Sequence, residues 1–108
     1  MTATTIDTAQ DLVTLINVLT VDPDKQQELI ALLAEATEQV MRHRPGFISA
    51  NIHAGLDGTT VINYAQWRSP ADFQAMLGDA AAREHMNAAT ALATADPRLY
   101  RVASVHHG

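Results

Sequence analysis

The segment DLVTLINVLTV, residues 11–21, limits the possible folds more than any other part of the sequence. Its residues alternate with the period of a β-strand, and both sides of that strand are apolar. Leu15 and Leu19 point to one side, and Ile16 and Val18 point to the other. A strand with two apolar sides has to be covered on both of them. Helices can cover one side of its sheet, and the other side then needs a second layer.

The rest of the chain shows helical and strand-like periods in a regular order. Proline at the first helical position marks the start of two helices, at Pro23 and Pro70. Asp57-Gly58 is a strong signal for a hairpin between two strands. The expected elements after the first strand are a helix within 22–44, strands at 46–54 and 59–67, helices at 69–77 and 80–93, and a last strand within 96–107 that follows a turn at Asp96-Pro97.

This order, β-α-β-β-α-β, is typical of the ferredoxin-like fold. It predicts an α+β protein whose four-stranded antiparallel sheet carries the helices on one face. The opposite face would carry Ile16, Val18, Ile62 and Tyr64 without a third layer, so we expect a homodimer in which two sheets pack together. In the strand at 46–54, alternation predicts one face of Phe47, Ser49, Asn51 and His53 and another of Ile48, Ala50 and Ile52.

Length and composition narrow the class of protein. The 108 residues suit a single domain, which we expect to span 11–108 behind a loosely held segment at 1–10. The formal net charge is −5 and no basic run occurs, which argues against nucleic acid or an anionic membrane as a partner. Cysteine is absent, and no apolar stretch approaches the ~20 residues of a membrane span. A soluble cytoplasmic protein is the expectation.

Three residues of the expected strands are unusual for a small core. Asn63 and Trp67 share one face of the strand at 59–67, and Asn17 has the corresponding position in the first strand. Asparagine is depleted in strands and is costly to bury without partners. Taken singly, each residue could be structural, as an amide tied to the backbone or an indole that fills the core. If all three face the helices, they converge between sheet and helices and indicate a binding or catalytic site.

Histidine is the other candidate for chemistry. His85 lies in the helix expected at 80–93, where it could be a general base, a haem ligand or a solvated residue. No two histidines show the H-x-x-x-H spacing, so a metal site is not expected. Flavin, nicotinamide and phosphate-binding glycine motifs are also absent. Any redox chemistry would have to come from a substrate and dioxygen, or from a cofactor held in the core.

The stretches PGF at 45–47 and NYAQWRSPADF at 63–73, with REHM and DPRLYRVASVH further on, resemble the antibiotic biosynthesis monooxygenase superfamily. The resemblance runs from Val13 to His106 and is greatest to small monooxygenases that oxidise anthrones and quinols in actinobacterial polyketide pathways. It implies a dimeric α+β barrel, a small aromatic substrate, dioxygen and no cofactor. It also implies that Asn17, Asn63 and Trp67 take part in oxygenation. The substrate enolate would pass an electron to dioxygen while amide donors stabilise the oxyanion.

Some positions depart from that group. Ile52, Phe73 and Asn87 stand where anthrone oxidisers can carry tyrosine or arginine. The resemblance therefore implies a less polar substrate site, lined by these three residues together with Met76 and His85.

A second branch of the superfamily degrades haem with an asparagine, a tryptophan and a histidine ligand. Asn17 and His85 match two of these positions, whereas Met76 stands in place of the tryptophan. Haem binding or degradation therefore ranks below quinol oxygenation. A non-catalytic ligand-binding module is an alternative of a different class, because a fold alone does not determine a reaction.

Overall fold

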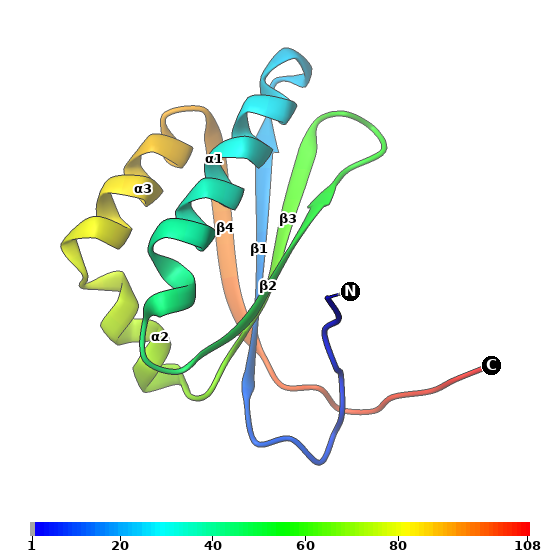
Figure 1. The fold of residues 1–108 in the computed structure, drawn as a ribbon. Coiled ribbons are helices and arrows are strands. Elements are labelled where there is room, and N and C mark those ends of the chain that lie inside the picture. Colours follow the sequence, from blue (N-terminus) through cyan, green and yellow to red (C-terminus); the bar gives the residue numbers. More distant parts are fainter. Residues whose placement is uncertain (1) are drawn as a thin grey trace.

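A computed structural model of the chain describes residues 2–108. Its antiparallel sheet has the strand order β2-β3-β1-β4. The strands are β1 (Val13–Val21), β2 (Phe47–Ala54), β3 (Thr60–Trp67) and β4 (Ala93–Tyr100). The helices are α1 (Gln26–Gln39), α2 (Pro70–Leu77) and α3 (Ala80–Thr90), with short 3₁₀ turns η1 (Pro23–Lys25) and η2 (Met41–His43) beside α1. All three α-helices lie on one face of the sheet (Figure 1), which confirms the predicted ferredoxin-like α+β fold.

The end of the chain differs from the sequence prediction. Helix α3 ends at Thr90, and β4 begins at Ala93, before the turn predicted at Asp96-Pro97. Pro97 lies inside β4, opposite Asn17 of β1. A proline is tolerated there because β4 is an edge strand, where the missing N–H can face solvent. Residues 101–107, predicted to continue this strand, carry no helix or strand.

A β-bulge at Ile48 corrects the predicted faces of β2. Phe47 pairs with Trp67, but the next pair along the two strands is Ser49 with Gln66, so Ile48 is an extra residue. Phe47 therefore faces the helices beside Trp67, and the prediction that it shares a face with Ser49 was wrong. The two rings meet edge to face, with centroids 5.5 Å apart.

Two hydrophobic clusters fill the space between sheet and helices. The Trp67 cluster consists of Leu15, Val40, Ala65, Trp67, Phe73, Met76 and Ala82. The Leu29 cluster consists of Leu19, Val21, Leu29, Val61 and Ala89. The central strands β1 and β3 each provide side chains to both clusters. On each strand, an asparagine lies between the residues of the Trp67 cluster and those of the Leu29 cluster. Asn17 follows Leu15 and precedes Leu19, and Asn63 lies between Val61 and Ala65.

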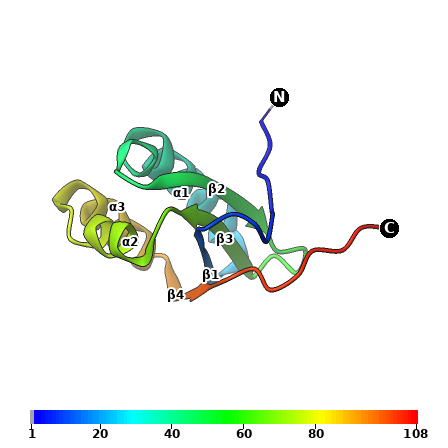
Figure 2. The same ribbon diagram turned by 90° about the horizontal axis from the view of Figure 1, so that it is seen from below.

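The helix-free face of the sheet is covered in part by the N-terminal segment. The carbonyl of Thr5 accepts a hydrogen bond of 2.8 Å from Gln66 Nε2, and Thr4 Oγ1 donates one of 2.6 Å to Asn51 Oδ1. Figure 2 shows both ends of the chain on the side of the sheet away from the helices. Met1 lies outside the described residues, and the loose hold on residues 1–10 stays a prediction. Between residues 2 and 108, no helix is both long and apolar enough to cross a membrane.

Asp79 links the start of α3 to the segment that follows η2. Its Oδ2 caps α3 by accepting a hydrogen bond of 2.9 Å from the N–H of Ala82, and its Oδ1 accepts one of 2.9 Å from Arg44 after η2. We expect Asp79→Ala to lower the free energy of unfolding by about 1–2 kcal/mol, because it removes a cap together with a partly buried ion pair. Urea unfolding measures this loss. Glu38→Ala is the control, because it breaks only the exposed Arg42–Glu38 pair; an equal loss there would contradict the role of Asp79.

Candidate active site

A cavity of about 490 Å³ lies between the sheet and the helices. This volume is in the range of small-molecule sites. All four strands and all three helices contribute to its walls. Its lining is mainly apolar and includes Leu15, Leu33, Met41, Phe47, Met76, Met86 and Leu99. Such a cavity suits an apolar ring system held by a small number of polar contacts.

The two amides singled out in the sequence meet in this cavity. Asn17 of β1 and Asn63 of β3 are direct cross-strand partners, so their Cβ atoms are roughly 4.5–5.5 Å apart. Both residues line the cavity. The site therefore contains two adjacent amides on the sheet. The sequence indicated that they would converge only if both faced the helices.

The hydrogen bonds of these amides indicate which of their atoms remain available. Asn17 Oδ1 accepts a hydrogen bond of 3.2 Å from the backbone N–H of Asp96. Because a backbone N–H is always a donor, the amide oxygen must face β4, and the Nδ2 group is left as a donor. Asn63 Oδ1 is buried and has no partner within residues 2–108. An unpaired buried amide oxygen is costly unless a ligand or water completes the site.

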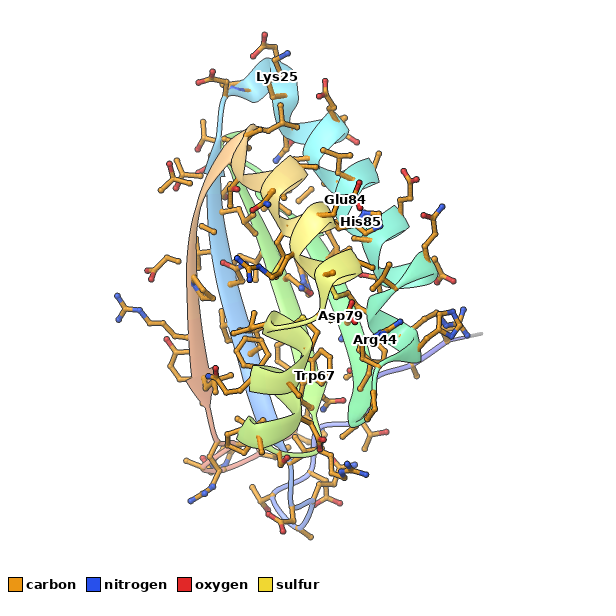
Figure 3. All side chains as sticks on the ribbon, turned by 90° about the vertical axis from the view of Figure 1, so that its left-hand side faces the viewer. Lys25, Arg44, Trp67, Asp79, Glu84 and His85 are labelled. Carbon is orange, nitrogen blue, oxygen red and sulfur yellow. The ribbon has the colours of Figure 1, made fainter. Side chains whose placement is uncertain are left out.

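Trp67 forms an aromatic wall of the cavity. It is only 2% exposed and packs edge-on against Phe47 and against Phe73, whose ring centroid is 6.0 Å away. Phe73 belongs to α2, so Trp67 lies between this helix and the sheet (Figure 3). These contacts hold the indole in one orientation. Trp67 therefore packs in the core and also lines the cavity.

The structure brings together six of the eight site residues predicted from the sequence. Those that line the cavity are Asn17, Asn63, Trp67, Phe73, Met76 and His85. Ile52 packs against the Leu29 cluster instead. Asn87 is exposed on α3, because it follows His85 by two residues and so points about 200° away around the helix. Ile52 is nevertheless the cross-strand neighbour of Asn63, and its contact with a substrate stays a prediction, as does that of Asn87.

Sequence reasoning missed several lining residues. Phe47 was assigned to the wrong face because nothing in the local sequence marks the bulge at Ile48. Pro97 and Leu99 were missed because the proline was taken as part of a turn rather than of an edge strand. Leu33 of α1 recurs at helical spacing with Leu29, Ala36 and Val40, and this apolar stripe could have indicated a wall of the cavity.

Charged groups are nearly absent from the cavity walls. Within the described part of the chain, the titratable side chains among the lining residues are His85 and Arg98. Arg98 donates a hydrogen bond of 3.3 Å to Asp96, which raises the pKa of its guanidinium group.

At the corner between β3 and α2, hydrogen bonds from Arg68 and Ser69 lower the pKa of the Asp72 carboxyl group. No group of three or more His, Asp or Glu side chains in residues 2–108 is placed to hold a metal ion.

Comparisons with known proteins agree with this architecture. The family model described as antibiotic biosynthesis monooxygenase matches residues 12–89. The tetracenomycin-F1 monooxygenase of Streptomyces glaucescens is 51% identical over 83 residues, which are 77% of this chain and 74% of that protein.

Solved structures with the same fold include two from Streptomyces. One is a monooxygenase from the gene ActVA-Orf6 of Streptomyces coelicolor in complex with nanaomycin D. It is 27% identical with a TM-score of 0.82, and the match covers 92% of this chain and 94% of that one. The other is SnoaB of Streptomyces nogalater, described as a cofactor-independent oxygenase. It is 24% identical with a TM-score of 0.72, and the match covers 88% of this chain and 96% of that one.

Proposed function

The chain belongs to the antibiotic biosynthesis monooxygenase family and is a monooxygenase, and from this premise we propose that it oxygenates an anthrone- or quinol-like polyketide with dioxygen and without a bound cofactor. The observation that carries the proposal is the pair Asn17 and Asn63, side by side in an apolar cavity beside Trp67. A relative named for tetracenomycin F1 and a structural neighbour that holds nanaomycin D support this class of substrate.

In the proposed reaction, the apolar walls, the aromatic side chains and the two amides have separate roles. An electron-rich anthrone loses a proton, and its enolate can then pass an electron to dioxygen. The apolar walls exclude water, and Trp67, Phe73 and Met76 hold the ring system. Asn17 and Asn63 stabilise negative charge on the substrate oxygen, which in an apolar site is worth more than in water. These contributions require orientation and amide donors rather than a metal or a flavin.

Dioxygen uptake tests the proposal. Protein treated with a chelator and dialysed is mixed with 1,8-dihydroxyanthrone, a model substrate, in an oxygen electrode. We expect uptake of one dioxygen per anthrone, well above the rate with heat-denatured protein. Saturable binding of the anthrone without extra uptake would contradict oxygenation and support a non-catalytic binding module.

We also propose that the chain is a homodimer whose sheets pack face to face. Ile16, Val18 and Ile62 are only partly buried on the helix-free face of the sheet. A second copy would cover these apolar side chains.

Sedimentation measures this assembly. At micromolar concentration the mass should be near twice 11.7 kDa. Val18→Lys should shift the protein toward monomers, since it buries a charge in the proposed interface. Ala31→Lys is the control, because Ala31 is exposed on α1, on the opposite side of the sheet. A monomeric wild-type protein, or equal effects of the two substitutions, would contradict this interface.

A further inference from the structure

We propose that the imidazole of His85 is the base that takes the proton from the substrate, an inference that rests on the proposed function. The amides can stabilise an oxyanion but cannot accept a proton at neutral pH. The cavity therefore needs a separate acid–base group, and its lining and geometry point to His85.

The position of His85 along α3 matches that of the two amides along the sheet. Ala82, three residues before it, belongs to the Trp67 cluster, and Ala89, four residues after it, belongs to the Leu29 cluster. Residues at this spacing share one helical face, so His85 lies on the face that packs toward the sheet. The amides also lie between these two clusters. His85 and the amides therefore contact the cavity at the same level, from its opposite layers.

Hydrogen bonds within residues 2–108 do not tie the ring of His85 to the rest of the fold. No hydrogen bond joins it to another residue within 2–108, although it is half-buried on α3 (Figure 3). By contrast, His43 Nε2 lies 3.2 Å from the carbonyl of Glu38, and His53 Nδ1 lies 3.1 Å from the carbonyl of Asn51. Those two histidines are exposed outside the cavity. His85 alone among the three combines a free ring with a place in the cavity wall.

No other charged side chain in the cavity wall described by residues 2–108 can act as the base. Arg98 also lines the cavity, but a guanidinium remains protonated and pairs here with Asp96. The charged residues of α3 and of the elements that contact it, α1, α2 and β4, are Glu28, Glu35, Glu38, Asp72, Arg83, Glu84, Asp96 and Arg98. Asp79 caps α3 and pairs with Arg44. Of all these residues, Arg98 is the one that lines the cavity. An imidazolium formed at His85 would therefore face the enolate without a competing carboxylate in the wall.

In the proposed step, a C–H bond of the anthrone methylene group breaks. Its proton passes to a ring nitrogen of His85, and its electron pair stays on the substrate as the enolate. The enolate gives one electron to dioxygen, and the resulting radical and superoxide combine into a peroxide anion bonded to carbon. The imidazolium returns the proton to this peroxide. Loss of the second C–H proton with cleavage of the O–O bond gives a carbonyl and water, so one dioxygen is consumed per substrate.

The test compares His85→Gln with His43→Gln, a histidine outside the cavity. We expect His85→Gln to lower kcat by about 10²–10⁴-fold with a smaller change in KM, because a positioned base typically contributes that much. In the wild type, kcat should fall on the acid side of its pH profile, and this fall should be absent from His85→Gln. His43→Gln should keep both the rate and the pH profile. A wild-type rate and profile in His85→Gln would overturn the inference.

A second readout needs no oxidation. The dye 2-hydroxyanthraquinone differs in colour between its phenol and phenolate forms, and it lacks the methylene group that is oxidised. If His85 accepts a proton from a bound ligand, the wild type should bind the phenolate at a pH where the free dye is mostly phenol. His85→Gln should bind the phenol. Identical spectra would overturn the role of His85, whereas a His85-dependent phenolate band without anthrone turnover would reject only the proposed oxygenation.

Discussion

Replacing Asn63 with alanine is expected to slow anthrone oxidation by about 10²–10³-fold, the usual cost of removing one donor to a developing oxyanion. The Asn63 side chain makes no hydrogen bond that holds the fold together, and its buried oxygen has no partner in residues 2–108. The variant should therefore fold, dimerise and bind the anthrone. Dioxygen uptake gives the turnover, and quenching of Trp67 fluorescence gives the binding.

Two further variants sharpen this experiment. Asn63→Asp should be slower still than Asn63→Ala, because a carboxylate repels the enolate. Asn51→Ala is the control for a structural amide, since Asn51 Nδ2 donates to the carbonyl of Tyr64 on the other face of the sheet. It should lower the free energy of unfolding by roughly 1–3 kcal/mol and leave turnover of the folded protein unchanged. Unchanged oxidation in both Asn63 variants would exclude this amide from the mechanism.

The second large effect is expected at Trp67. Phenylalanine keeps much of the packing against Phe47 and Phe73 but removes the indole N–H and part of the wall. We expect Trp67→Phe to lower the free energy of unfolding by about 0.5–3 kcal/mol. If the N–H donates to an anionic substrate, a loss of about 1.5–3 kcal/mol in the transition state corresponds to a further tenfold to hundredfold loss of turnover in the folded protein.

Thermal unfolding and dioxygen uptake on the same preparation separate these two effects. Activity is divided by the folded fraction at the assay temperature. If activity per folded molecule equals that of the wild type, Trp67 is a packing residue only.

Much of the fold could be predicted because local signals agreed with one another. The alternation of 11–21 and 59–67 placed Asn17, Asn63 and Trp67 on the faces that the structure shows. Pro70 and Asp57-Gly58 correctly marked the start of α2 and the turn between β2 and β3, whereas Pro23 begins the 3₁₀ turn that precedes α1. These features depend on residues close together in the sequence, and they therefore predict the central strands and the two amides well.

The errors occur where pairing between distant segments decides the structure. The bulge at Ile48 follows from the register of β2 against β3, and no glycine or proline marks it. Pro97 is compatible with β4 only because β4 lies at the sheet edge, a property that the local sequence does not contain. The amides could thus be found from sequence, whereas most of the cavity wall could not.

The central claim is oxygen transfer from dioxygen without a cofactor, and isotope labelling tests it most directly. Metal-free protein in chelator is given 1,8-dihydroxyanthrone under ¹⁸O₂, and the product is examined by mass spectrometry against a heat-denatured control. The account predicts rapid formation of an anthraquinone that carries one ¹⁸O atom, with the second atom recovered as water. A product formed only when metal or flavin is added, or one whose new oxygen comes from solvent water, would contradict it.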